Sequence, residues 1–247
     1  MNTIYCNFAD LNYRQHQNFL IDHIKTNNMF DDAIAFTKEW LISTNFYKQN
    51  KNILDRQRLC GYALWKPYII LEALKASKND DIIIYMDCGD RPINNKINQH
   101  VKDYIQKHNE KYFLSGLTNT QGMYTKRDTF ILMGCDEPRY WRDIQQEDGF
   151  IALKKSNSNI EFVEEWLHFC KNENILTDIP NTCGLPNLPE FIDHRHDQSV
   201  ISLLKTKYSI PMNDSAREYI ETNVLYHKDG ESYSNGTARW NEMGEKI

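Results

Sequence analysis

The sequence lacks any apolar run that approaches the ~20 residues of a membrane-spanning helix, so we expect no transmembrane segment. It also lacks a basic excess, because Lys and Arg number 29 against 34 Asp and Glu, and the formal net charge is -5. Binding to nucleic acid without sequence preference needs a basic surface. We therefore expect no nucleic-acid partner. The chain shows no internal repeat and no low-complexity tract.

The 6 cysteines are widely scattered, and none belongs to a Cys-x-x-Cys pair of the kind that zinc sites use. We interpret them as reduced, mostly buried thiols. Residues 1–8 contain neither a basic segment nor a long apolar one, which predicts that no secretory signal is present. Together these features favour a cytoplasmic protein, with peripheral association with a membrane left open.

What is present is typical of a soluble globular protein: 247 residues, of which 40% are hydrophobic and 26% are charged. That length suits one large domain or two small ones. Short apolar segments alternate with amphipathic ones, which predicts an α/β domain with a central, mostly parallel sheet flanked by helices. We predict strands at residues 3–8, 32–37, 81–87 and 149–153, helices at 14–26, 67–75, 160–170 and 199–207, a helix start with a capping box at Thr125, and an irregular loop at 174–190.

Two acidic residues follow the apolar strand at 81–87, namely Asp87 and Asp90. Ligands of open α/β sheets bind beyond the carboxyl ends of the strands, where carboxylates can hold a divalent cation. Mg²⁺ and Mn²⁺ prefer such oxygen ligands. The alternative is that both acids only cap the turn after the strand.

A second polar cluster, Asp193-His194-Arg195-His196-Asp197-Gln198-Ser199, directly precedes the last predicted helix. A helix N-terminus with such side chains favours bound anions and positioned polar groups. The simpler interpretation is that Asp197 is the N-cap of this helix. Two further clusters carry basic side chains: Arg58 and Lys66 before the helix at 67–75, and His227 with Lys228 near the C-terminus.

Taken in order, these motifs resemble GT-A glycosyltransferases, especially the retaining family that includes glycogenin and bacterial lipopolysaccharide galactosyltransferases. In that family an Ala-Asp-x-Asn-Tyr turn after the first strand binds the nucleotide, and residues 9–13 read Ala-Asp-Leu-Asn-Tyr. The family's Asp-x-Asp metal motif is matched at Asp87, but Gly89 occupies the second acidic position and Asp90 follows it. Either Asp90 takes over through a shifted turn, or metal binding is weak or indirect.

The resemblance implies a single GT-A (Rossmann-like) domain over residues 1–247, with a nucleotide-binding half at 1–90, an acceptor and catalytic half at 91–228 and a polar tail at 229–247. It implies transfer of a hexose from a nucleotide diphosphate sugar, with a UDP-sugar as the expected donor, to a glycan or other hydroxyl acceptor, as in polysaccharide biosynthesis. Mn²⁺ or Mg²⁺ would assist. The implied residues are Ala9, Asp10, Asn12, Tyr13, Arg58, Lys66 and Lys228 for the donor, Asp87, Asp90 and His227 for the metal, and Asp197 and Gln198 for catalysis, with His194 and His196 as further candidates.

Gln198 would lie beside the anomeric carbon, and because an amide is a poor nucleophile we favour retention by same-face substitution. Inversion would need a carboxylate base instead, for which Asp197 and Asp136 are the candidates. Two other functions remain open. One is a metal-dependent phosphohydrolase that uses His194 and His196 as ligands together with the acids. The other is a non-catalytic domain that binds nucleotide sugars or glycans.

Overall fold

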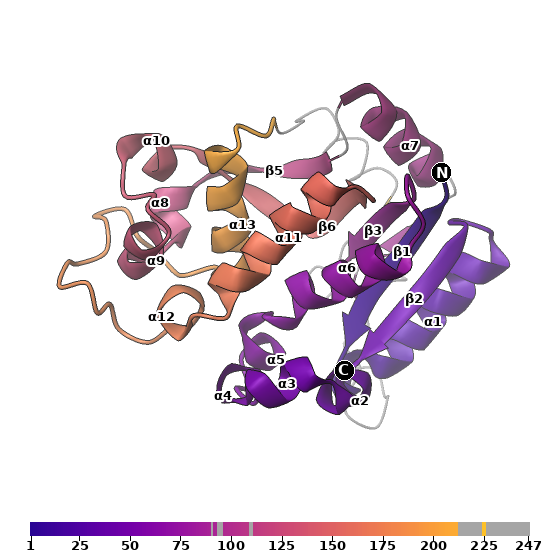
Figure 1. Ribbon diagram of the computed structural model, residues 1–247, viewed down its shortest axis with the longest axis horizontal. Coiled ribbons are helices and arrows are strands. Elements are labelled where there is room, and N and C mark those ends of the chain that lie inside the picture. Colours follow the sequence, from indigo (N-terminus) through magenta and orange to yellow (C-terminus); the bar gives the residue numbers. More distant parts are fainter. Residues whose placement is uncertain (90, 93–95, 109–110, 212–223, 226–247) are drawn as a thin grey trace.

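The centre of the molecule is a five-stranded open sheet with the strand order β2-β1-β3-β6-β5 (Figure 1). The computed structural model describes residues 1–89, 91–92, 96–108, 111–211 and 224–225. The strands of this sheet are β1 (Thr3–Ala9), β2 (Asp32–Thr37), β3 (Ile82–Met86), β5 (Lys111–Thr120) and β6 (Ile144–Lys154). A second sheet pairs β4 (Arg91–Pro92) with β7 (Val224–Leu225).

Four strands of the main sheet run in one direction. β1 pairs in parallel with both β2 and β3. β6 runs the other way, because it pairs antiparallel with β3 and with β5. The predicted α/β fold with a mostly parallel sheet is therefore confirmed.

Helices cover both faces of this sheet (Figure 1). The long helices are α1 (Arg14–Thr26), α6 (Trp65–Ala76), α7 (Lys96–His108), α11 (Asn157–Cys170) and α13 (His196–Lys207). Strand β3 shows the division: Ile84 packs in one core with α1 and α7, whereas Ile83 and Tyr85 pack in the other with α6, α11 and α13. All side chains of β3 are buried, as expected of a strand covered on both faces.

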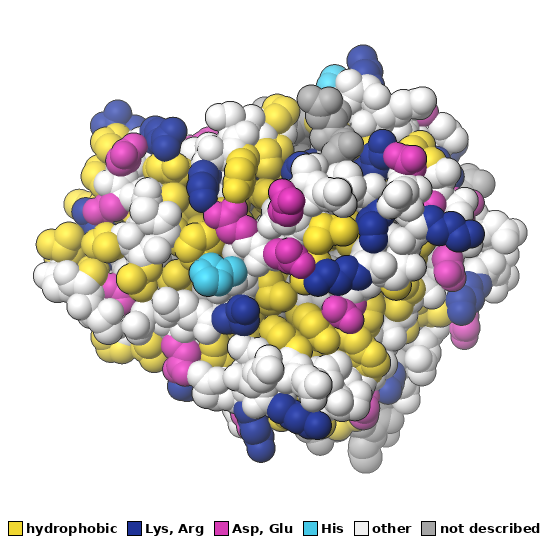
Figure 2. All heavy atoms as spheres, viewed as in Figure 1, with side chains coloured by type: hydrophobic (Ala, Val, Ile, Leu, Met, Phe, Trp, Pro, Cys, Tyr) yellow, Lys and Arg dark blue, Asp and Glu magenta, His cyan; other side chains and the backbone are white. Residues whose placement is uncertain are grey.

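The remaining helical segments are short. They are η1 (Leu11–Tyr13), α2 (Lys38–Ser43), α3 (Asn45–Gln49), α4 (Lys51–Leu54), α5 (Leu59–Tyr62), α8 (Gln121–Tyr124), α9 (Arg127–Leu132), α10 (Pro138–Trp141) and α12 (Glu173–Leu176). Among the described residues, no helix has both the length and the apolar character that crossing a bilayer requires. On the face over α6 and α11, basic and acidic side chains are interspersed with apolar ones (Figure 2).

Most elements predicted from the sequence are present with small shifts in their bounds. The strand predicted at 149–153 is the second half of the longer β6, and β5 and α7 were not predicted. The capping box predicted at Thr125 is wrong. Lys126 is the N-cap of α9, and the Asp128 carboxylate instead accepts from the backbone N–H groups of Thr182 and Cys183.

Candidate active site

A cleft with a volume of about 1040 Å³ opens at the carboxyl ends of β1 and β3. This is the edge at which open α/β sheets bind ligands. The cleft brings together most of the site residues predicted in the described part of the chain. Those that line it are Asp10, Tyr13, Arg58, Lys66, Asp87, His194, His196, Asp197 and Gln198. Asp90, His227 and Lys228, which were also predicted, lie outside the described residues.

The turn after β1 forms one wall of the cleft. Asp10 is the N-cap of η1, and its carboxylate accepts from the backbone N–H of Asn12 at 3.0 Å and from the Asn12 side-chain amide at 3.3 Å. Ala9 is buried beneath the turn, where it packs with Leu20 and Cys88. Ala9 and Asn12 are thus part of the turn but not of the cleft lining. The carboxylate that lines the cleft is held by the turn's own backbone.

Asp87 lies at the end of β3, where the sheet reaches the cleft. Its backbone N–H donates to the Gly149 carbonyl across the β3–β6 ladder at 2.9 Å. The Tyr85 hydroxyl donates to its Oδ1 at 2.5 Å, and the carboxylate is 47% exposed. Burial, followed by the Asp87 charge, raises the pKa of Tyr85 well above its ordinary value, so this hydroxyl stays a donor. Asp87 therefore presents an oriented carboxylate to the cleft.

A buried lysine lies between Asp87 and two further carboxylates. The Lys66 ammonium is 2.8 Å from Asp148 Oδ2, 3.5 Å from Asp87 Oδ1 and 3.6 Å from Asp197 Oδ2. Its side chain is only 6% exposed, and it also lies over the Tyr85 ring, 5.1 Å from the centroid. Burial alone would lower the pKa of Lys66, but the three carboxylates outweigh burial and raise that pKa well above its ordinary value. Lys66 is a permanent cation at the base of the cleft.

Asp197 is the most buried of the three carboxylates. Burial raises its pKa well above the ordinary value; the Lys66 ammonium opposes this shift and the Asp148 carboxylate adds to it. Asp197 is therefore protonated over a wider pH range than an exposed aspartate. The interpretation of Asp197 as an N-cap is wrong, because Arg195 occupies that position and Asp197 Oδ2 has no hydrogen-bond partner among the described residues.

Asp148 belongs to this cluster but was not predicted from the sequence. It lies one residue before the predicted strand start at Gly149, and nothing in its local sequence marks it. The β3–β6 register, in which Met86 pairs with Phe150, carries it next to Asp87. Only the antiparallel pairing of two strands far apart in the sequence brings these acids together.

Gln198 lines the cleft beside Asp197. Its amide nitrogen donates to the Gln146 carbonyl at 2.8 Å, which holds the side chain against β6. By contrast, Asp136, a candidate base, is paired with Arg127 at 2.9 Å and accepts from the Trp141 indole at 3.0 Å. It is not among the residues that line the cleft.

A run of left-handed backbone precedes Lys66. Leu59, Cys60, Gly61, Tyr62 and Ala63 all have positive φ, with values from 47° to 95°. Left-handed backbone costs a non-glycine residue about 1–2 kcal/mol. Gly61 is required here, since a Cβ at this position would lie 2.6 Å from the Leu54 Cα. The segment labelled α5 is thus a left-handed turn, and we call residues 59–63 the left-handed turn.

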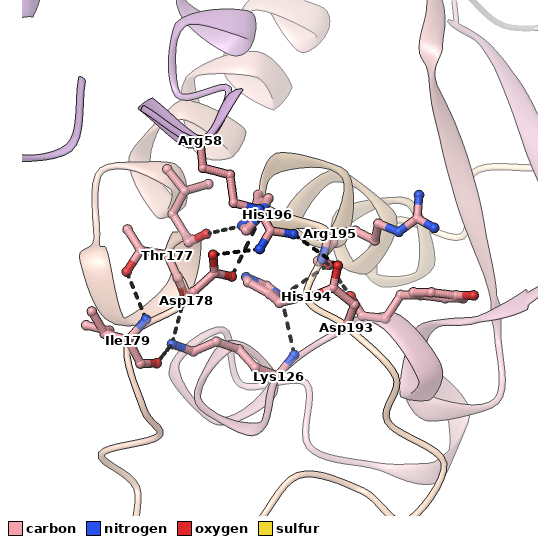
Figure 3. Close-up of polar contacts among 12 residues, drawn as sticks. Arg58, Lys126, Thr177, Asp178, Ile179, Asp193, His194, Arg195 and His196 are labelled. Carbon is pink, nitrogen blue, oxygen red and sulfur yellow. Dashed lines mark hydrogen bonds and ion pairs between the residues drawn. The ribbon is translucent and has the colours of Figure 1, made fainter. Parts of the chain in front are cut away.

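Arg58 enters this turn and connects it to the segment between α12 and α13, residues 177–195. Its Nη1 is 2.9 Å from Asp178 and its Nη2 is 3.0 Å from Asp193 (Figure 3). The start of the 177–195 segment is also fixed by Lys126, whose buried ammonium donates to the carbonyls of Thr177 and Ile179. Burial lowers the pKa of Lys126. The two ion pairs with Asp178 and Asp193 mean that the Arg58 guanidinium already has two carboxylate partners.

The two candidate histidines lie side by side below Arg58 (Figure 3). His194 accepts at Nδ1 from the Lys126 backbone N–H at 3.3 Å, so its Nε2 carries the proton and donates to the Ile175 carbonyl at 2.8 Å. His196 Nδ1 lies 2.9 Å from the Leu176 carbonyl. Burial lowers the pKa of both rings. Both nitrogens of His194 are occupied, which does not fit a metal ligand.

The charge of the cleft is dominated by acids. Its lining contains Asp10, Asp87, Glu147, Asp148, Asp193 and Asp197 against Arg58, Lys66 and Arg195. Within the described part of the chain, Arg195 is the cation of this set without an ion-pair partner; its guanidinium lies over the Tyr124 ring, 4.6 Å from the centroid. A polyanionic ligand would need a cation in such a cleft.

The described residues contain no group of three or more His, Cys, Asp or Glu side chains placed to hold one metal ion. Asp87 alone of the predicted metal ligands is described. Its half-exposed carboxylate at the strand end, in an acidic cleft, is an oxygen ligand suited to a hard divalent cation.

Comparisons with known proteins give the following. Neither a protein-family model nor a curated protein matches the chain. The fold is similar to a crystal structure of a glycosyltransferase involved in the glycosylation of the major capsid of PBCV-1, with a TM-score of 0.36 and 11% identity over 78% of this chain and 81% of that chain. It is also similar to mouse xyloside xylosyltransferase 1 in its apo form, with a TM-score of 0.42 and 6% identity over 86% of this chain and 84% of that chain. Because both TM-scores are below 0.5, we base the function on the geometry of the cleft.

Proposed function

We propose that this chain transfers a hexose from a nucleotide diphosphate sugar, with a UDP-sugar as donor, to a hydroxyl of a glycan acceptor. The observation that carries this proposal is the convergence of the Asp10 turn and the Lys66 cluster in one cleft at the strand ends. The first supplies a fixed carboxylate for a nucleoside, and the second supplies buried polar groups for a sugar. Clefts with a few oriented polar groups are typical of small-molecule sites.

In this proposal the main polar residues of the cleft each have a definite role. Asp10, ordered by Asn12, binds the nucleoside, and Arg195 contacts the diphosphate. Asp197, which keeps its proton to higher pH than an exposed aspartate, donates a hydrogen bond to a sugar hydroxyl, and Lys66 compensates the neighbouring Asp87 and Asp148 carboxylates. Mn²⁺ or Mg²⁺, held by Asp87 together with the predicted ligands Asp90 and His227, would neutralise charge on the leaving diphosphate.

We further propose that the transfer retains the anomeric configuration. Asp197 can accept a proton only after it has lost its own, which burial delays to higher pH, and Asp136 is engaged by Arg127 away from the cleft. Both candidate bases for inversion are therefore disfavoured. The Gln198 amide, fixed by Gln146, can stabilise positive charge at the anomeric carbon without attacking it. The configuration of the product, read by proton NMR, tests this part of the proposal.

The phosphohydrolase is less well supported than the transferase. It relies on His194 and His196 as ligands, and both ring nitrogens of His194 are already engaged by backbone groups of neighbouring segments. Release of phosphate from p-nitrophenyl phosphate, without turnover of any nucleotide sugar, would reverse this preference. A binding domain without activity would bind UDP but hydrolyse none of the donors.

The direct experiment is a panel of UDP-glucose, UDP-galactose, UDP-N-acetylglucosamine, UDP-xylose and GDP-mannose, each incubated with the full chain and Mn²⁺. We expect slow hydrolysis of one UDP-sugar and UDP binding that Mn²⁺ strengthens, measured by calorimetry. Asp87→Asn should weaken the effect of Mn²⁺, whereas Asp22→Asn, the same change at an exposed acid of α1, should not. UDP binding that ignores both Mn²⁺ and Asp87→Asn would remove the metal from the proposal.

A further inference from the structure

We propose that Arg58 is a positioning residue: its pairing with Asp178 and Asp193 holds the left-handed turn, and through this turn Lys66, against the 177–195 segment. We call these three residues the Arg58 clamp. This inference rests on the proposed function and assigns Arg58 a role other than binding donor phosphates.

The first observation is that the backbone of the left-handed turn is strained. Leu59, Cys60, Tyr62 and Ala63 carry side chains that disfavour positive φ, and L-residues adopt this conformation as single residues, not in runs. Such backbone persists only where surrounding contacts determine it. The contacts around the turn are therefore part of the reason why it exists.

Those contacts begin at Arg58. Its carbonyl accepts from the backbone N–H groups of Gly61 at 3.1 Å and Tyr62 at 2.7 Å, so the same residue that forms the ion pairs also closes the turn. The turn ends on the cleft side, where the Lys66 N–H donates to the Ala63 carbonyl at 2.8 Å. The Trp65 indole donates back to the Leu59 carbonyl at 3.0 Å. A displacement of Arg58 would pass directly to Lys66.

The second observation comes from the opposite wall. His196 also has a positive φ, 52°, and it directly precedes Asp197. The Tyr62 ring packs edge-on against the His196 ring, with centroids 4.8 Å apart. Two left-handed positions, one leading to Lys66 and the other to Asp197, thus contact each other. Beyond this contact the Lys66 ammonium and Asp197 Oδ2 lie 3.6 Å apart.

The third observation concerns charge. Each terminal nitrogen of Arg58 faces its own carboxylate, at 2.9 Å and 3.0 Å. One guanidinium between two aspartates is a site with net negative charge, which repels a phosphate. A phosphate ligand would have to displace Asp178, Asp193 or both. The geometry fits a link between two segments better than an anion site.

The two possible roles of Arg58, phosphate binding and the clamp, predict different effects of replacing its carboxylate partner Asp193. If Arg58 bound phosphate, Asp193→Asn would free the guanidinium and tighten UDP binding, while Arg58→Gln would weaken it. If Arg58 is a clamp, both changes lower kcat for donor hydrolysis by about ten- to a hundredfold, because Lys66 is misplaced. Both then leave the Kd for UDP within about twofold. The double variant should cost little more than Arg58→Gln alone.

Arg58→Lys sharpens the test, because lysine keeps the charge but cannot form the two-armed pairing. We expect it to be as impaired as Arg58→Gln, whereas a phosphate contact would be largely preserved. The matched control is Arg56→Gln. Arg56 is equally exposed, at 45%, and pairs with Glu173, but it does not line the cleft. The Arg56→Gln variant should leave kcat for donor hydrolysis unchanged.

Hydrogen exchange over residues 57–66 gives a readout that needs no activity. In Arg58→Gln and Asp193→Asn, the amides of Gly61 and Tyr62 should exchange about tenfold faster or more, with the rest of the chain unchanged. Unchanged exchange in both variants, or tighter UDP binding by Asp193→Asn, would overturn the clamp. A wild-type chain that binds no UDP and turns over no donor would instead overturn the proposed function, and the exchange experiment would still decide the clamp.

Discussion

Lys66 of α6 and Asp148 of β6 form an ion pair of 2.8 Å in which neither side chain is more than 11% exposed. Removing one partner of a buried pair leaves the other charge uncompensated, which typically costs 3–5 kcal/mol. We therefore expect Lys66→Met to lower the free energy of unfolding by about this amount in urea titrations. Asp148→Asn in the same chain should restore part of the loss.

The control for this prediction lies on the same helix. Lys75 pairs with Glu164 at 2.9 Å, but both side chains are 48% exposed. Exposed pairs contribute about 0–1 kcal/mol, so Lys75→Met should change stability little. Equal effects of Lys66→Met and Lys75→Met would contradict the description of Lys66 as a buried cation.

The raised pKa of Asp197 predicts a pH dependence of stability. In the unfolded chain an aspartate loses its proton near pH 3.9, whereas the folded protein keeps this proton to higher pH. Over that window the folded state binds more protons, so Asp197 destabilises the fold increasingly as pH rises, by up to about 1.4 kcal/mol per pH unit. The stability of Asp197→Asn relative to wild type should therefore increase with pH. Urea midpoints between about pH 5 and about pH 8 would show it, and parallel curves for both proteins would refute it.

The fold could be predicted from the sequence where a helix or strand is marked by the hydrophobic pattern of its own segment. The apolar run at 81–87 and the helical spacing at 14–26 gave β3 and α1 with bounds close to those observed. β5 and α7 were missed. The segment between Asp90 and Thr125 offers polar residues at most positions, and β5 forms by pairing with β6, a strand more than twenty residues further along the chain.

The candidate site was predictable one residue at a time but not as a cluster. Asp87, Asp197 and Lys66 were each singled out by their place before or after an element, yet their contact depends on how three elements pack. Asp148 had no local signal, since only the β3–β6 register places it. Arg58 was predicted as a basic group for phosphate because its partners, Asp178 and Asp193, are remote in sequence.

Gly61 gives a prediction about the left-handed turn itself. Gly61→Ala would place a Cβ 2.6 Å from the Leu54 Cα, and backbone cannot yield as a flexible side chain does. Overpacking of this kind costs about 1–3 kcal/mol, which in a chain of this size lowers Tm by about 2–4 °C per kcal/mol. Gly184 is the matched control, with φ of 77° and no atom within 4 Å of a built Cβ. Calorimetry should show a larger loss of Tm for Gly61→Ala, and equal losses would mean that only φ matters.

Arg195 gives a prediction about the donor. Its guanidinium lies on the Tyr124 ring and has no ion-pair partner among the described residues, so its donors are available to a ligand. A hydrogen bond to a charged group contributes about 1.5–3 kcal/mol, and we expect Arg195→Ala to weaken UDP binding about tenfold or more. Arg142→Ala removes an exposed arginine outside the cleft lining and should have no effect.

The same variant can locate the contact on the ligand. If Arg195 binds the diphosphate, the loss of affinity in calorimetry should be large for UDP, smaller for UMP and absent for uridine. The effect should also shrink as salt is raised, because part of the attraction is screened. An equal loss for all three ligands would place Arg195 at the nucleoside. An unchanged affinity for UDP would exclude Arg195 from the donor site.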